Sequence, residues 1–112
     1  MTIYRRTLKR NDTGPALRVQ LRSKDTGAPI SLGGATAKFL MCGVDGVLKV
    51  NASAVIEDAV DGLIRYDWQA DDTDTAGEFD GEVEVTFAGP RVETYPQNGY
   101  IQIVIDSDLD DA

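Results

Sequence analysis

Hydrophobic residues recur at every second position along most of the chain, and not at the three- and four-residue spacing of a helix. Such alternation is typical of a β-strand with one buried face. The clearest run covers residues 78–87, where Phe79, Gly81, Val83, Val85 and Phe87 are expected to face inward. The residues between them are polar, mostly acidic, and should face outward.

Six further segments show the same alternation or a short apolar run. Their inward positions are 17, 19 and 21; 35, 37, 39 and 41; 64, 66 and 68; and 101, 103 and 105, with shorter strands at 52–56 and 92–95. Turn sequences separate the segments, and Asp45-Gly46 and Asp61-Gly62 fit tight hairpins in which both central residues have positive φ. No segment predicts a helix beyond a single turn near residues 71–76.

About seven short strands with turns at this spacing predict two antiparallel sheets packed face to face. The expected fold class is therefore all-β, an immunoglobulin-like antiparallel β-sandwich. The length of 112 residues suits one domain, and the chain contains no repeat or linker. We expect residues 1–112 to form a single domain with a basic N-terminal segment.

The charge is divided unevenly along the chain. Seven basic residues and one acid give residues 1–24 a formal charge of +6, and the net charge of −8 leaves −14 for the remainder. An acidic body does not suit nucleic-acid binding, which needs an extended basic surface. A basic end on an acidic body instead favours pairing with itself or with another protein. The basic candidate contacts are Arg5, Arg6, Lys9 and Arg10.

The outward acids Glu78, Asp80, Glu82 and Glu84 form a stripe along one predicted strand. Paired carboxylates can hydrolyse glycosidic bonds, but such pairs need a cleft and one raised pKa. A regular strand places alternate residues on a flat surface. We therefore interpret the stripe as a device against edge-to-edge aggregation, with a docking face for a basic partner segment as the second interpretation.

Other chemistry is scarce in the sequence. The chain has no histidine, which removes imidazole bases and nearly every zinc site, so we expect no enzyme and no cofactor. The single cysteine, Cys42, follows Phe39-Leu40-Met41 and is expected to be a small buried hydrophobe.

The acidic segment 71–77 invites a calcium-loop interpretation, which its spacing does not support. Counting from Asp72, the fifth position is Ala76 and the twelfth is Val83, where a bidentate Glu is required. We expect a corner of the sandwich in which an aspartate caps backbone N–H groups. A looser calcium site, and a hydrolase centred on Asp71, Asp72 and Asp74, remain as alternatives.

An ordered series of turn and core residues resembles the N-terminal immunoglobulin-like domain of siphophage baseplate upper proteins, found in phages and prophages. The most telling stretch is Gly62-Leu63-Ile64-Arg65-Tyr66-Asp67-Trp68. It is accompanied in order by matches at 12–17, 19–21, 25–32, 34–39, 55, 72–73, 77–79, 82–87, 96 and 99–101. The series spans residues 8 to 106.

The resemblance implies a virion structural protein of the tail or baseplate, assembled in the host cytoplasm and acting by protein–protein binding. It implies other tail or baseplate proteins, or a second copy, as partners, and it transfers no catalytic residues. The chain ends at Ala112 without the long continuation of that family, so we expect a stand-alone subunit or an adaptor.

Two further expectations concern surfaces. A carbohydrate-binding β-sandwich used in host-surface recognition is the alternative function, with Tyr95 and Tyr100 as its candidate exposed aromatics. No apolar run approaches the roughly 20 residues that cross a bilayer, and the basic N-terminus precedes no apolar stretch. We therefore expect no membrane insertion and no secretory signal.

Overall fold

The computed structural model describes residues 2–97, 99–107 and 109, and contains eight strands and one short 3₁₀ turn. The strands are β1 (Thr2–Lys9), β2 (Leu17–Gln20), β3 (Thr36–Gly43), β4 (Leu48–Asp58), β5 (Leu63–Tyr66), β6 (Gly77–Thr86), β7 (Val92–Tyr95) and β8 (Tyr100–Asp106). The 3₁₀ turn η1 spans Ala70–Thr73. The all-β prediction is confirmed, and the single helical turn overlaps the expected position at 71–76 but begins one residue earlier and ends three residues sooner.

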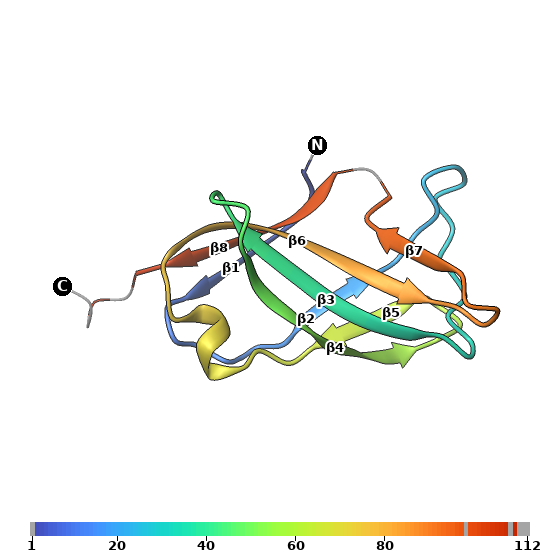
Figure 1. Ribbon diagram of the computed structural model, residues 1–112, viewed down its shortest axis with the longest axis horizontal. Helices are drawn as coiled ribbons and strands as arrows, with labels where there is room; N and C mark the ends of the chain where they lie inside the picture. The colour runs from blue at the N-terminus through green and yellow to red at the C-terminus, as the bar shows by residue number, and fades with distance from the viewer. Residues whose placement is uncertain (1, 98, 108, 110–112) are drawn as a thin grey trace.

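The strands follow one another in the order β1-β8-β6-β3-β4-β5-β2, with β7 added beside β6 (Figure 1). The long strand β4 joins the two layers of the sandwich. Its Leu48–Ala54 part pairs with β3, and its Val55–Asp58 part pairs with β5. The two layers therefore share one bent strand and form a nearly closed body.

The N-terminal segment forms β1, which pairs with β8 in parallel, whereas every other strand pair is antiparallel. The prediction of a wholly antiparallel sandwich is thus wrong at this one pair. The strand that was not predicted from the sequence is β1, which is formed by the basic segment.

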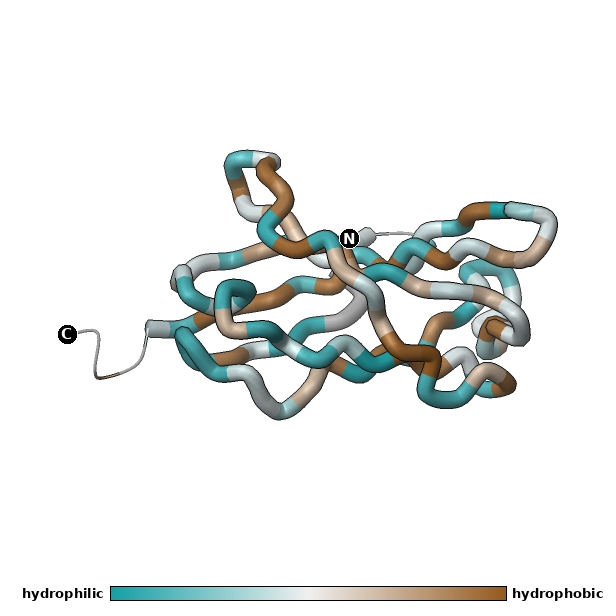
Figure 2. Tube along the Cα trace, turned by 60° about the horizontal axis from the view of Figure 1, so that its bottom comes forward, coloured by the Kyte–Doolittle hydropathy of each residue, from teal (hydrophilic) through white to brown (hydrophobic). Residues whose placement is uncertain are grey.

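The core is built from the inward residues of the alternating runs. Figure 2 shows hydrophobic and hydrophilic residues alternating along the strands. At its centre, the ring of Phe39 lies 4.9 Å from that of Tyr66 and 5.7 Å from that of Trp68. Gly81 faces this cluster. A Cβ there would lie 2.9 Å from Cε1 of Phe39, so the glycine makes room for the ring.

The two predicted hairpin turns adopt positive φ only at the glycine. Gly46 has φ +78° and Gly62 has φ +68°, while Asn11 is the one non-glycine residue in that region among those described. The expectation of positive φ at Asp45 and Asp61 is therefore wrong. At Gly62 a Cβ would also lie 2.6 Å from the carbonyl oxygen of Ile30, so the position excludes any side chain.

The corner between β5 and β6 is organised by Asp72. This buried carboxylate accepts hydrogen bonds through Oδ2 from the Tyr66 hydroxyl at 2.5 Å and from the Gln69 N–H at 2.8 Å. Burial, followed by the hydrogen bond to Asp72, raises the pKa of Tyr66. The expected aspartate cap is confirmed.

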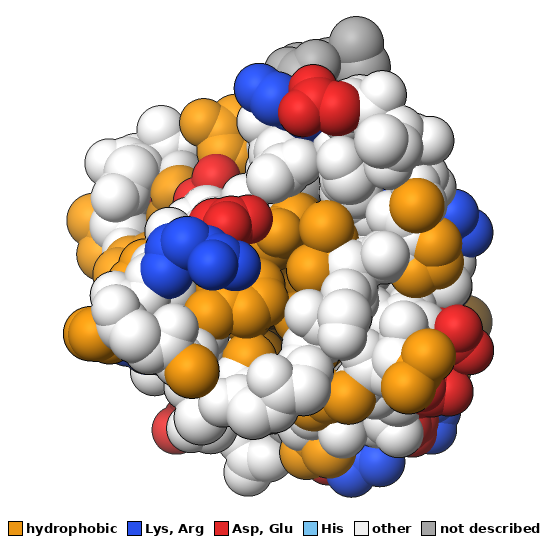
Figure 3. Space-filling model, turned by 90° about the vertical axis from the view of Figure 1, so that its right-hand side faces the viewer, with side chains coloured by type: hydrophobic (Ala, Val, Ile, Leu, Met, Phe, Trp, Pro, Cys, Tyr) orange, Lys and Arg blue, Asp and Glu red, His pale blue; other side chains and the backbone are white. Residues whose placement is uncertain are grey.

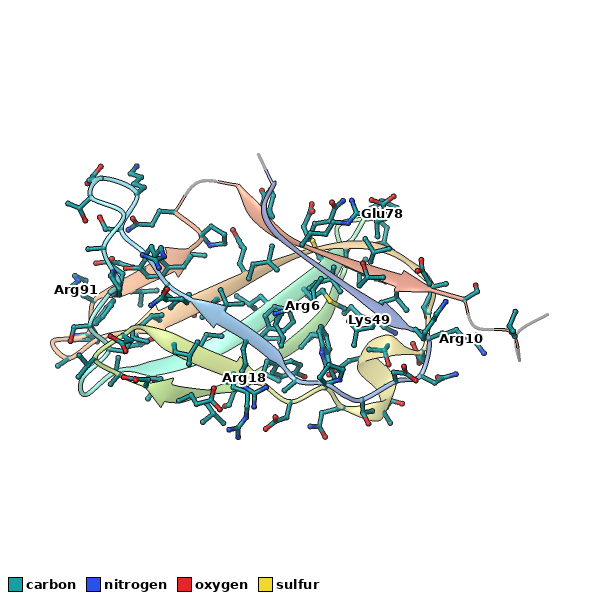
Figure 4. All side chains as sticks on the ribbon, turned by 180° about the vertical axis from the view of Figure 1, so that it is seen from behind. Arg6, Arg10, Arg18, Lys49, Glu78 and Arg91 are labelled. Atoms are coloured by element: carbon teal, nitrogen blue, oxygen red, sulfur yellow. The ribbon has the colours of Figure 1, made fainter. Side chains whose placement is uncertain are left out.

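Strands β1 and β2 are the two ends of the strand order and do not pair with each other. Arg6 connects them, because its Nη2 donates to the Arg18 carbonyl oxygen at 3.4 Å. Figure 4 shows Arg6 in the space that separates the two strands. Farther along, the end of β2 and the β7–β8 turn line a cavity that is described below.

Candidate protein-binding face

The outward side chains of β1, β8, β6 and β3 form one continuous surface, which we call the outer face. Strand register aligns Arg5 with Gln102, Gln102 with Asp80, and Asp80 with Cys42. A second row runs from Thr7 through Val104 to Glu78. The outer face consists of Arg5, Thr7, Lys9, Lys38, Leu40, Cys42, Glu78, Asp80, Glu82, Glu84, Gln102 and Val104.

This face gathers six of the eight candidate contacts predicted from the sequence. All four acids of the stripe and the basic residues Arg5 and Lys9 lie on it. Arg5 and Asp80 are two strands apart, which corresponds to about 10 Å. The basic groups of β1 and the acidic groups of β6 therefore lie on the same face, on either side of β8.

The other two candidates, Arg6 and Arg10, lie elsewhere. Arg6 turns toward β2, as described above. Arg10 follows β1 and lies near Asp74. The hydrogen bond from Lys49 holds the pKa of Asp74 below its usual value, and the hydrogen bond from Thr75 and the charges of Lys49 and Arg10 lower it further. Figure 4 shows Arg10 and Lys49 at this same end of the body. The basic segment is thus divided between two surfaces.

The acidic stripe does not protect a sheet edge, because β6 lies between β8 and β3. The first interpretation of the stripe is therefore wrong. Glu78 and Asp80 are exposed, while Glu82 and Glu84 are half-buried. Burial, and then the charges of Asp80 and Glu84, raises the pKa of Glu82. Like charges concentrated on this interior strand give its part of the outer face a negative surface charge.

Cys42 is half-buried on the outer face, which corrects the expectation of a buried hydrophobe. Alternation along β3 buries Phe39 and Met41 and turns Cys42 the other way. It lies in a shallow depression of about 240 Å³ whose lining also includes Glu78, Asp80 and Gln102. Gln102 donates from Nε2 to Oε1 of Glu78 at 2.8 Å, which orients that carboxylate.

The structure bears on the two alternative sites, the acidic segment around Asp72 and the candidate sugar-binding tyrosines. Asp72 directs its carboxylate inward to Tyr66 and Gln69, while Asp71 and Asp74 are exposed. Tyr95 is only 1% exposed, so its assignment as an exposed sugar-binding aromatic is wrong. Tyr100 remains exposed. Among the described residues, no three His, Cys, Asp or Glu side chains are close enough to hold a metal ion.

A charged network on the second layer was missed in the sequence. Glu57 pairs with Arg18 at 3.0 Å and with Arg65 at 3.1 Å, joining β2, β4 and β5. The hydrogen bond from Arg65, followed by that from Arg18, lowers the pKa of Glu57. The residues are outward positions of three strands, but only the strand order reveals that they meet.

An apolar cavity of about 530 Å³ was also missed. It lies between the end of β2 and the β7–β8 turn, and Figure 3 shows it as a hollow with a hydrophobic floor. Its lining residues are Val19, Gln20, Leu21, Arg22, Ser23, Lys24, Gly27, Tyr95, Pro96, Gln97 and Ile101. They come from two segments, 19–27 and 95–101, that lie far apart in the sequence, so no local sequence pattern could have found the cavity.

The fold resembles two solved structures. One is the N-terminal domain of ORF48 of phage TP901-1, with a TM-score of 0.62, 15% identity, and coverage of 95% of this chain and 99% of that one. The other is CopC from Methylosinus trichosporium OB3b, with a TM-score of 0.52, 10% identity, and coverage of 94% and 86%. At these identities the likeness concerns the fold.

The searches by sequence add no family. No family model matches the chain, and no curated protein matches it. In the part of the chain that the structure describes, no helix has the length and apolar character that crossing a membrane requires.

Proposed function

We propose that the chain is a structural protein of a phage or prophage tail or baseplate, which acts by binding other proteins of the particle. The observation that carries the proposal is the whole-length likeness to a phage protein domain, which covers 95% of this chain. The ordered sequence resemblance to siphophage baseplate upper proteins points the same way. We assign no catalytic step to the chain.

The outer face is the surface that we propose for the main contact. It presents a mixed pattern of charges over four paired strands, which can recognise a partner by complementary charge and fix its orientation. Its half-buried members, Leu40, Cys42 and Val104, provide apolar area between the charges. Contacts of this kind weaken as salt rises, because exposed charges are screened within about 8 Å at physiological ionic strength.

The experiment that tests this function counts copies of the chain in tailed particles. Particles released from a host that carries the gene are purified, and the chain is quantified by mass spectrometry against the major tail protein. The native chain should be present in a fixed ratio. The double variant Glu78→Lys with Asp80→Lys should lower that ratio about tenfold, because a reversed charge in a matched contact costs at least that much affinity.

The matched control is Asp61→Lys with Asp71→Lys, which changes the same charge at exposed positions away from the outer face. Its ratio should equal that of the native chain. Particles that never contain the native chain would overturn the function. Equal ratios for the outer-face variant and the control would overturn the outer face as the contact.

A further inference from the structure

The apolar cavity has a floor and walls that hold their shape. Leu21, Tyr95 and Ile101 line it and are nearly fully buried side chains of the core. The backbone N–H of Lys24 donates to Oε1 of Gln97 at 2.9 Å, which ties the segment after β2 to the β7–β8 turn. The cavity is therefore a built feature between two connected walls.

The charged residues that line the cavity are both basic. The guanidinium of Arg22 is held in place, since Nη1 donates to the Gly27 carbonyl oxygen at 2.8 Å and Nη2 donates to the side chain of Gln20. Further N–H groups of the guanidinium can meet a carboxylate. Lys24 provides the second positive charge, and the adjacent Asp25 is not part of the lining. The rim favours an acidic ligand.

Beside the cavity, β2 offers an open strand edge. Leu21 directs its backbone groups toward the β5 side, where its N–H donates to Gly62 at 2.7 Å and its carbonyl accepts from Ile30 at 2.8 Å. Because the backbone groups alternate along a strand, those of Gln20 and Arg22 point to the side where the described part of the chain places no strand. An extended segment can add to such an edge.

The acidic end of this chain has the composition that the cavity requires. Residues 106–111 read Asp-Ser-Asp-Leu-Asp-Asp, a single apolar residue among four acids. The side chain of Leu109 is 94% exposed. Figure 1 shows that β8, which leads into this segment, ends at one end of the body's 49 Å long axis, while the cavity opens toward the opposite end, the one viewed in Figure 3.

We propose that the cavity binds the C-terminal segment of a second copy of this chain, with Leu109 on the apolar floor and its flanking aspartates against Arg22 and Lys24. The contact joins one end of a molecule to the other end of the next, so it is head-to-tail and builds a ring if the rotation closes. This contact names a second copy of the chain as one partner within the proposed tail or baseplate. Only its place in a phage particle rests on the proposed function.

The test measures self-association of the full chain by light scattering and sedimentation over a range of concentrations. The native chain should form species larger than its 12.1 kDa monomer as concentration rises. Leu109→Asp should raise the concentration needed about tenfold, because a buried anchor residue of an interface is lost. Val44→Asp, which changes an equally exposed apolar residue that follows β3 and does not line the cavity, is the matched control and should leave association unchanged.

A charge exchange identifies the two surfaces. The rim variant Arg22→Glu with Lys24→Glu and the tail variant Asp108→Lys with Asp110→Lys should each associate weakly alone and associate with each other when mixed. Lys24→Glu alone tests the rim while leaving the side-chain contacts of Arg22 intact, and the melting temperature checks the fold of each variant.

A native chain that stays monomeric, variants that associate like the native chain, or a mixture that does not associate would each overturn the contact. The function proposed above fails on a different result, the absence of the chain from particles. A monomeric chain that still enters particles overturns the head-to-tail contact alone.

Discussion

At the residue scale, Asp72 shows how one carboxylate can hold a corner. It is 8% exposed and receives hydrogen bonds from both Tyr66 and Gln69, so it joins the last residue of β5 to the turn that leads into β6. The sequence predicted a capping aspartate in this segment. It could not select Asp72 from its neighbours Asp71 and Asp74, because only the folded chain brings the Tyr66 hydroxyl to one of them.

Replacing Asp72 should therefore cost stability. Asp72→Ala leaves a buried hydroxyl and a backbone N–H without their acceptor, and we expect the free energy of unfolding to fall by about 2 kcal/mol. Urea denaturation measures the change. Asp71→Ala, at the exposed neighbouring position, should stay within about 0.5 kcal/mol of the native chain. A cost for Asp72→Ala no larger than that of Asp71→Ala would show that the corner does not depend on this carboxylate.

At the element scale, the alternating runs located seven strands but gave them imperfect limits. The strand expected at 52–56 extends over Leu48–Asp58, because β4 serves both layers and its ends pair with different neighbours. The basic segment showed too little alternation to be assigned. It becomes β1 through its pairing with β8, more than 90 residues later in the chain, and no local pattern carries that information.

The integration of β1 into the core has a measurable consequence. Leu8 is 7% exposed, whereas Lys9 beside it is exposed. Leu8→Ala should lower the free energy of unfolding by about 2 to 3 kcal/mol, because it removes a buried side chain and leaves a cavity. Lys9→Ala should change it by less than about 0.5 kcal/mol. Chemical denaturation with far-UV circular dichroism reports both values, and similar effects for the two variants would mean that β1 is not packed against the core.

At the scale of the whole molecule, the sandwich was accessible from the sequence because the burial of one strand face leaves a local signature. The surfaces that we connect with function were not accessible in the same way. The outer face depends on register, which places Arg5 and Asp80 on either side of Gln102. The cavity depends on β2 and the β7–β8 turn meeting across the open side of the body.

The proposed role in the tail or baseplate of a phage particle, where the chain would bind other proteins, can be tested directly. The most direct measurement is immunogold electron microscopy of purified tailed particles from a host that carries the gene, using antibody against this chain. Our account predicts label concentrated on the tail, at a constant number of gold particles per virion. Unlabelled tails on particles whose other tail proteins are detected would contradict it.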